Sequence, residues 1–182
     1  MDNSSFVKLC SKAWTLPVLA CLAEGTPCRV APIAAKLGAG RTSVSAAFPH
    51  LLELRLLQKN PGHGHPLRPE FELTVDGKAL SDWAASVLAD MPGKDHAFIR
   101  KQWTLPILRL FHRPRRYCDI RSQLQPITDR ALSISLKEMT ALNWISRTVD
   151  DAHAPPQVIY RPGRFVTQMH PVIAESFELQ IA

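Results

Sequence analysis

Long apolar runs are missing from this sequence. No stretch of its 182 residues approaches the ~20 apolar residues that a membrane-crossing helix needs. The first ten residues, MDNSSFVKLC, also lack the apolar segment of a secretory signal. We therefore expect a cytoplasmic protein with no membrane partner. Hydrophobic residues still make up 46% of the chain, which is typical of a folded protein and too high for a disordered one.

Cysteine is sparse, and its pattern fits no cofactor site. Cys10, Cys21, Cys28 and Cys118 form no CxxC pair, and their spacing suits neither a zinc site nor a disulfide framework. We expect four reduced thiols that pack mostly as small apolar groups. The segment GHGH offers two histidines but not the third and fourth ligands that zinc requires. The sequence thus predicts no metal and no other cofactor.

Signatures of the common enzyme classes are also absent from the sequence. It contains no Gly-rich phosphate loop, no nucleophile elbow and no convincing pair of catalytic carboxylates. The neighbouring acids Asp150 and Asp151 fit the tip of a hairpin better than a catalytic site. We therefore expect a protein that is not an enzyme.

Positive charge is present in excess and is unevenly spread. The net charge is +6. Residues 1–90 hold 9 Lys/Arg against 8 Asp/Glu, whereas residues 91–182 hold 13 against 8, so the second half carries +5 of the total. A basic balance of this kind favours a polyanionic partner.

The sequence contains an internal repeat. WTLPVL begins at Trp14 and WTLPIL begins at Trp103, 89 positions later. With small loop adjustments the two halves stay in parallel, so that Leu51 aligns with Met139 and Leu57 with Ile145. A period near 88 residues is too long for a solenoid and suits two small domains. The segment ADMPGKD at 89–95 places the boundary, which predicts domains 1–90 and 91–182.

The second half has the pattern of a helix-turn-helix followed by a hairpin. After the break at Gln125-Pro126, Thr128 is a suitable N-cap for a helix at about 129–142. The inward positions of this helix are Leu132, Leu136 and Met139, and its outer positions are Arg130, Ser133, Ile134 and Lys137. The segments 144–149 and 157–161 are predicted strands around a polar tip.

The first half repeats the plan. Helices are expected at about 12–24, 31–37 and 42–55, and strands at about 56–60 and 70–74. Pro17 and Pro106 predict that their helices begin at or kink near these positions, and Pro49 falls inside the third helix. The predicted fold class is α+β, mainly helical with small β-hairpins, as two tandem winged helix-turn-helix domains that form a pseudo-dimer.

These motifs resemble the HxlR-type winged helix-turn-helix regulators of bacteria. The second half offers KQWTLPIL, RRYCDIRSQL, RALSISLKEM and PPQVIY, and the first half offers KAWTLPVL and FELTVDGKAL. Family members are similar to one half of this chain and usually pair as homodimers, so the chain resembles a covalently fused dimer. The frequent family cysteine falls at Asp2 and Met91, so redox sensing does not carry over.

The resemblance implies a transcriptional regulator that binds double-stranded DNA, associates with the nucleoid and reads the major groove with the helices at about 42–55 and 129–142. The sign of its control and any further homodimerisation stay open. The residues expected on DNA are Arg41, Thr42, Ser43, Ser45, Arg115, Arg116, Arg121, Arg130, Ser133 and Lys137, with His63, His65, Arg68 and His153 on the wings.

An alternative is a tandem winged-helix protein that docks other proteins or organises chromosomes. Such a platform has no need of the basic cluster at 109–121, which favours the regulator. For any single exposed cation on these helices, an ordinary solvated surface position is the competing interpretation.

Overall fold

The computed structural model describes residues 1–60, 70–151 and 156–175. The fold mixes helices with two small antiparallel sheets, so it is α+β as expected. The described residues divide into two compact units. One comprises those of Lys12–Arg100, and the other combines Asp2–Ser11 with those of Lys101–Ser176. Among the described residues, no helix has the length and apolar character needed to cross a membrane.

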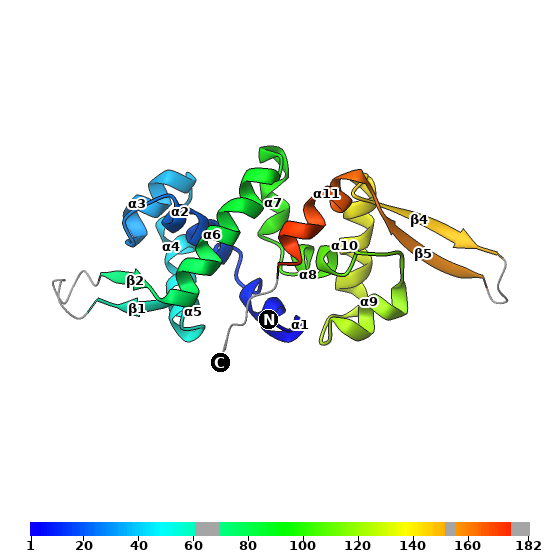
Figure 1. Ribbon diagram of the computed structural model, residues 1–182, viewed down its shortest axis with the longest axis horizontal. Coiled ribbons are helices and arrows are strands. Elements are labelled where there is room, and N and C mark those ends of the chain that lie inside the picture. Colours follow the sequence, from blue (N-terminus) through cyan, green and yellow to red (C-terminus); the bar gives the residue numbers. More distant parts are fainter. Residues whose placement is uncertain (61–69, 152–155, 176–182) are drawn as a thin grey trace. The chain divides into compact units, whose positions relative to one another are not determined.

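In the described part of the first unit, four helices and a hairpin precede the α6 helix, and a short extension follows it. In order they are α2 (Thr15–Ala23), α3 (Val30–Leu37), α4 (Arg41–Ser45), α5 (Ala47–Glu53), β1 (Leu57–Lys59), β2 (Phe71–Leu73), α6 (Val75–Asp90), the 3-10 turn η1 (Gly93–Asp95) and α7 (His96–Ile99). β1 and β2 pair antiparallel, with Leu57 opposite Leu73. The long helix α6 packs along α2 (Figure 1).

Besides α6, the described residues of the first unit form five α-helices, of which α2 to α5 precede the hairpin and α7 follows η1. The unit encloses its own apolar core. Helix α6 contributes one face of this core through Leu80, Trp83, Ala84 and Val87. Its other large members include Leu16, Val18, Leu19, Ile33, Val44, Phe48, Leu51, Leu54 and Leu56.

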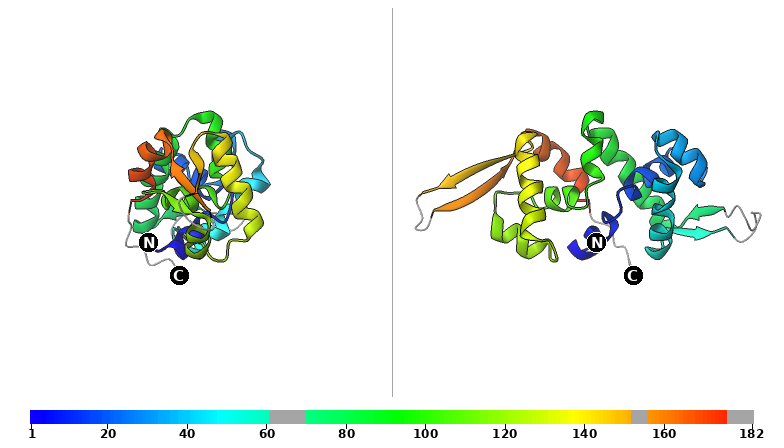
Figure 2. Two further views of the ribbon diagram at one scale, coloured as in Figure 1. Left: turned by 90° about the vertical axis from the view of Figure 1, so that its right-hand side faces the viewer. Right: turned by 180° about the vertical axis from the view of Figure 1, so that it is seen from behind.

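The second unit has a three-stranded sheet in place of the two-stranded one. Its elements are α1 (Asn3–Leu9), α8 (Thr104–Arg109), β3 (Arg115–Arg116), α9 (Tyr117–Gln123), α10 (Asp129–Ala141), β4 (Ile145–Asp150), β5 (Gln157–Pro162) and α11 (Arg164–Ile173). The strand order is β3-β5-β4, and β4 and β5 form a hairpin that extends from the helices of its unit (Figures 1 and 2).

The core of the second unit lies between α8, α10 and α11, with α1 packed against α8. Helix α10 contributes Leu132, Leu136 and Met139, which confirms the predicted inward stripe. The other large buried residues of the unit include Phe6, Leu9, Leu105, Leu108, Phe111, Ile120, Val166 and Ile173.

Within the described chain, four prolines lie in the first turn of a helix. Pro17, Pro32, Pro49 and Pro106 are each the third residue of a helix, namely α2, α3, α5 and α8. A proline has no N–H to donate and clashes with the carbonyl four residues earlier, so it is tolerated best in the first turn. Pro171 departs from this pattern, since it lies inside α11. The prediction that α2 and α8 start close to their prolines is confirmed.

The predicted helix at 42–55 is wrong in one respect, because the structure has two helices there. α4 ends at Ser45, and α5 begins at Ala47. Pro49 cannot donate to the carbonyl of Ser45, so a continuous helix would lose a hydrogen bond at that position. The side chain of Ser45 instead donates to the carbonyl oxygen of Thr42, at 2.9 Å. The buried stripe of Val44, Phe48 and Leu51 continues across the break.

The remaining predicted elements lie close to their expected bounds, whereas α1, η1, α7, β3 and α11 were not among the predicted elements. The hairpin strands and the helices α3 and α10 match the sequence predictions. The helix α1 lies with Lys101–Ser176 rather than with the first half of the chain. The division into domains 1–90 and 91–182 therefore stays a prediction of the sequence alone.

Candidate nucleic-acid interface

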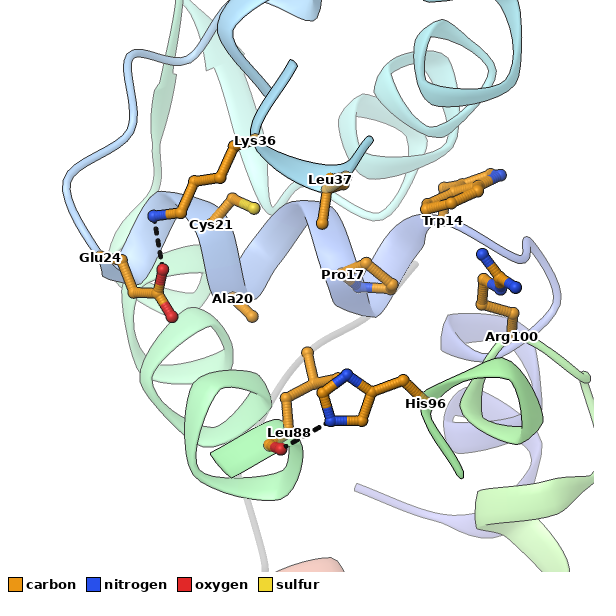
Figure 3. A pocket seen from close by; sticks show the side chains of 10 residues that line it. All are labelled: Trp14, Pro17, Ala20, Cys21, Glu24, Lys36, Leu37, Leu88, His96 and Arg100. Carbon is orange, nitrogen blue, oxygen red and sulfur yellow. Dashed lines mark hydrogen bonds and ion pairs between the residues drawn. The ribbon is translucent and has the colours of Figure 1, made fainter. Parts of the chain in front are cut away.

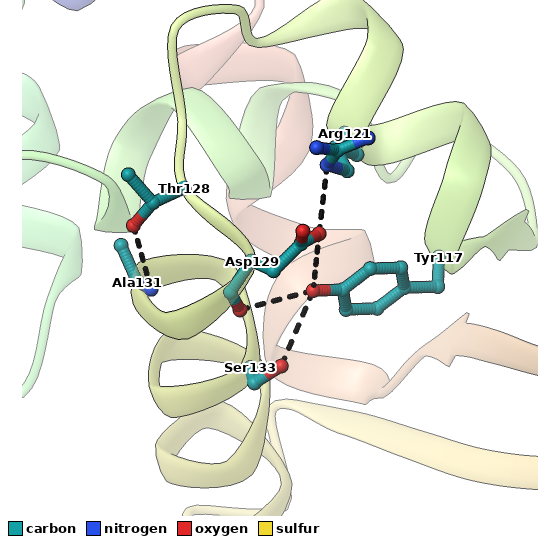
Figure 4. Close-up of polar contacts among 6 residues, drawn as sticks. All are labelled: Tyr117, Arg121, Thr128, Asp129, Ala131 and Ser133. Carbon is teal, nitrogen blue, oxygen red and sulfur yellow. Dashed lines mark hydrogen bonds and ion pairs between the residues drawn. The ribbon is translucent and has the colours of Figure 1, made fainter.

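Helices α9 and α10 form a helix pair whose turn is fixed by side chains. The hydroxyl oxygen of Thr128 accepts from the amide of Ala131 at 3.2 Å, which caps the start of α10 as expected. The hydroxyl of Tyr117, at the start of α9, donates toward the carbonyl oxygen of Asp129 at 3.0 Å and lies 3.2 Å from its carboxylate (Figure 4). Tyr117 thus ties the first residue of one helix to the first residue of the other.

The same cluster includes two of the predicted DNA residues. The hydroxyls of Tyr117 and Ser133 lie 3.2 Å apart, and Arg121 forms an ion pair of 2.7 Å with Asp129 (Figure 4). Both side chains of this pair are more than half exposed, so the pair contributes little to stability, but it orients Arg121 along the helix-helix turn.

The outer face of α10 is polar and accessible. Arg130, Ser133 and Lys137 are exposed, as is Ile134 at 49% of its surface. These positions are the outer face that the sequence predicted. Further along the helix, Glu138 is paired with Lys101 at 2.6 Å, so this carboxylate is neutralised by a cation of its own unit. Arg130 and Lys137 are left as the cations of the face itself.

A hollow of about 450 Å³ lies between the C-terminal half of α10 and the hairpin. Lys137 contributes to it from the helix and Arg147 from β4, and Tyr160 of β5 completes the strand side. Arg147 is exposed and pairs across the ladder with Tyr160. Lys137 and Arg147 therefore line one concave surface, where Arg147 adds its charge to that of the α10 face.

The structure places Arg115 differently from the other predicted phosphate contacts. Arg115 is only 8% exposed, and its Nε donates to the carbonyl oxygen of Leu110 at 3.1 Å. A terminal nitrogen of its guanidinium lies 3.1 Å from Nε2 of His112. Burial lowers the pKa of Arg115, and the nearby charge of Arg113 acts in the same direction. A side chain held inside its unit in this way is a structural element, so we leave it out of the proposed DNA surface.

Arg116, the next residue, is exposed and sits on the edge strand β3 opposite Ile159. Its amide donates to the carboxylate of Asp119 at 3.4 Å, which leads the chain into α9. Arg116 and Arg121 thus stand on successive parts of the segment that precedes α10, where the sequence expected contacts with phosphate.

In the first unit the corresponding face is smaller. Arg41, Thr42 and Ser43 are exposed on α4, a helix of five residues, whereas Ser45 is half-buried and bonded to the backbone of its own helix. This face carries one cation, compared with two on α10. The predicted wing residues His63, His65, Arg68 and His153 lie outside the described residues.

Sequence reasoning missed Tyr117 and Arg147. Tyr117 entered the sequence analysis only within the motif RRYCDIRSQL, and its spacing does not indicate that its hydroxyl reaches Asp129. The sequence did contain a signal for Arg147. Side chains two positions apart in a strand lie on the same face, so the predicted strand at 144–149 puts Arg147 on the same face of the hairpin as Ile145. Within the described residues, no group of three or more His, Cys, Asp or Glu side chains is arranged to hold a metal.

Comparison with known protein families adds one match. Residues 98–180 match the HxlR-like helix-turn-helix family. This HxlR-like region includes α8 to α11 and the hairpin, and therefore the exposed face of α10 and the Tyr117 cluster. Searches of curated proteins and of solved structures found no match. The family suggests a transcription regulator that binds DNA, and its members are regulators rather than enzymes.

Proposed function

We propose that this protein is a regulator of transcription that recognises specific sites in double-stranded DNA, with α10 as its principal recognition helix. The observation that carries the proposal is the exposed face of Arg130, Ser133 and Lys137 on a capped helix of a helix-turn-helix. A recognition helix in the major groove reads base edges with its outward side chains, and Arg is suited to a bidentate contact with guanine.

Charge on the neighbouring elements supports this role. Arg116 and Arg121 precede α10, and Arg147 follows it on the hairpin, so exposed cations flank the helix on both sides in sequence. Cations in such positions bind phosphates and fix the register of a protein on the duplex, while the recognition helix supplies specificity. The ion pair of Arg121 with Asp129 must loosen or be shared when Arg121 meets a phosphate.

We further propose that the two halves are diverged copies of one winged helix-turn-helix. The order of helices and hairpin supports this, as do the helices α2 and α8, which both begin with Thr-Leu-Pro. Two recognition helices on one chain would suit two half-sites about one helical turn, or 34–36 Å, apart. Since α4 presents one cation and α10 two, the second unit contributes more to affinity, and the preferred site is not a perfect palindrome.

The proposal is tested by affinity selection of fragmented genomic DNA, followed by sequencing. The purified wild type is compared with the double variant Arg130→Ala/Lys137→Ala. A matched control, Lys78→Ala/Lys94→Ala, removes the same charge from exposed positions on α6 and η1. We expect a shared motif for the wild type and the control, and its loss or blurring for the α10 variant.

The affinity of each variant for the selected motif measures how much each side chain contributes to DNA binding. Arg130→Ala should weaken binding by about 5- to 150-fold if the side chain contacts a guanine, and it should relax the preference at one base position. Arg41→Ala should have a smaller effect. Recovery of DNA without any motif would contradict sequence-specific regulation and indicate backbone binding. Recovery of no DNA would favour a protein-docking role.

A further inference from the structure

The first unit contains a hollow that the DNA-binding function does not use. It has a volume of about 260 Å³ and lies between α2, α3, the end of α6 and α7 (Figure 3). Pockets for drug-sized ligands measure roughly 300–1,000 Å³, so this one fits a smaller molecule with a single ring. Its lining residues are Trp14, Pro17, Ala20, Cys21, Glu24, Lys36, Leu37, Leu88, His96 and Arg100.

Most of the lining of this hollow is apolar, and its charged members are Glu24, Lys36 and Arg100. Pro17, Ala20 and Cys21 are buried on one face of α2, and Leu37 and Leu88 are half-buried on α3 and α6. Burial raises the pKa of the Cys21 thiol, so it stays protonated at neutral pH. Apolar walls of this kind favour an aromatic or aliphatic ring over a sugar or a peptide.

One end of the hollow carries a cation that is available to a ligand. The guanidinium carbon of Arg100 lies 4.7 Å from the ring centroid of Trp14. Arg100 is exposed, and the described part of the chain supplies it with no ion pair. Stacking on an aromatic face orients a guanidinium but leaves its N–H edges unoccupied, and these edges match the two oxygens of a carboxylate.

The other cation of the lining is already engaged. Lys36 forms an ion pair with Glu24 and donates to the hydroxyl of Thr26 at 3.1 Å. In Figure 3 this pair and Arg100 lie at opposite ends of the hollow. A negatively charged group therefore has one preferred position, which is beside Arg100.

His96 adds an acceptor on the floor of the hollow. Its Nε2 lies 3.1 Å from the carbonyl oxygens of both Leu88 and Met91. Since carbonyl oxygens only accept, Nε2 must carry the hydrogen, and in the neutral ring Nδ1 is then an acceptor. The imidazole edge that bears Nδ1 is turned toward Pro17 in Figure 3. A ligand with a hydroxyl group can donate to it.

We propose that this hollow binds a small aromatic carboxylate that carries a ring hydroxyl. The carboxylate accepts from the guanidinium of Arg100, the ring lies between Pro17, Leu37 and Leu88, and the hydroxyl donates to Nδ1 of His96. Leu37 is the last residue of α3, four positions before Arg41 at the start of α4. A bound ligand thus restrains the turn that leads into α4. An effect of this restraint on DNA binding rests on the proposed function, whereas the binding site itself does not.

The test measures the binding of 4-hydroxybenzoate to the purified full chain by calorimetry, in the absence of DNA. We expect one site per chain with a Kd on the order of 1 mM or tighter. The methyl ester of the same acid lacks the charge and should bind at least ~10-fold more weakly, and benzoate, which lacks the hydroxyl, should also lose affinity. These comparisons need no variant, so they do not depend on how a mutant folds.

Two variants locate the site. Arg100→Gln should weaken binding of 4-hydroxybenzoate by at least ~10-fold. The matched control Lys94→Gln, an exposed cation outside the lining of the hollow, should leave binding unchanged. The proposal is overturned by an absence of saturable binding at ~10 mM, by equal affinity for the acid and its ester, or by an unchanged Kd in Arg100→Gln. Because binding is measured without DNA, its failure is distinguishable from a failure of the proposed function.

Discussion

Arg55 and Asn143, which are 88 positions apart, share one unusual backbone conformation. Each has a φ of 56°, and each follows the helix that precedes a hairpin strand, α5 and α10 respectively. The left-handed region is disfavoured for most residues and is tolerated best by glycine and then by asparagine. The second unit therefore has a suited residue at this turn, whereas the first has a strained one.

The strain at Arg55 predicts that Arg55→Asn stabilises the first unit. We expect the free energy of unfolding to rise by about 0.5–1 kcal/mol, because asparagine adopts the left-handed region at a lower cost. Urea unfolding followed by circular dichroism measures the change. The reciprocal variant, Asn143→Arg, should lower stability by a similar amount. A decrease in Arg55→Asn would show that the Arg55 side chain makes a contribution larger than the strain.

The elements that the sequence predicted well are those in which several local signals agree. α10 has a capping threonine, an acid in its first turn and apolar residues at helical spacing, and all three specify the same start and the same buried face. The hairpin at β4 and β5 was equally clear, because a polar, proline-rich tip separates two strand-like runs. The exposed face of α10 followed directly, since it is the complement of the buried stripe.

The failures have physical causes of their own. The stripe of Val44, Phe48 and Leu51 keeps helical spacing across Ala46, so periodicity alone could not show that Pro49 splits the helix. α1 is seven residues long, and its stability depends on packing of Phe6 and Leu9 against a distant part of the chain. Arg115 was assigned to the surface on the strength of its charge, but its guanidinium is satisfied inside its unit by Leu110 and His112.

The hydroxyl of Tyr117 should stabilise the pair of α9 and α10. Tyr117→Phe removes its hydrogen bonds to Asp129 and Ser133 and is expected to lower the free energy of unfolding by about 0.5–1.5 kcal/mol. Ser133→Ala should cost less in the Tyr117→Phe background than in the wild type, since the partner is already gone. Denaturant unfolding of the two single variants and the double variant measures this coupling.

A serine outside this contact serves as the control. Ser122→Ala removes only a local bond to the carbonyl of Asp119 within α9, and its effect should add to that of Tyr117→Phe. Full additivity between Tyr117→Phe and Ser133→Ala would contradict the interhelical contact.

His112 should make the stability of the second unit depend on pH. Partial desolvation lowers its pKa, and the charges of Arg115, Arg113 and His170 act in the same direction. Because a guanidinium only donates, Nε2 of His112 must accept from Arg115, and a proton at that nitrogen removes the bond. The unfolded chain then binds a proton more readily than the folded chain, so stability is full above the ordinary histidine pKa of about 6.5 and falls as the pH drops below it.

The titration of His112 is measurable by NMR. We expect a midpoint below about 6.5 for the wild type and a higher one for Arg113→Gln, which removes one neighbouring cation. His112→Gln should flatten the fall in stability between about pH 7 and pH 5. A His112 midpoint at or above about 6.5 would contradict the effect of these cations.

The four cysteines should differ sharply in reactivity toward a thiol reagent. Cys118 is exposed, whereas Cys10 and Cys21 are buried and Cys28 is half-buried. Burial raises the pKa of Cys28 to about 12 and also raises those of Cys10 and Cys21, and only the thiolate reacts. We expect one thiol per chain to react rapidly with dithionitrobenzoate at pH 7.5 and all four to react in denaturant. Cys118→Ser should remove the rapid phase and Cys28→Ser should retain it, whereas a second rapid equivalent in the wild type would contradict the protection of the other three.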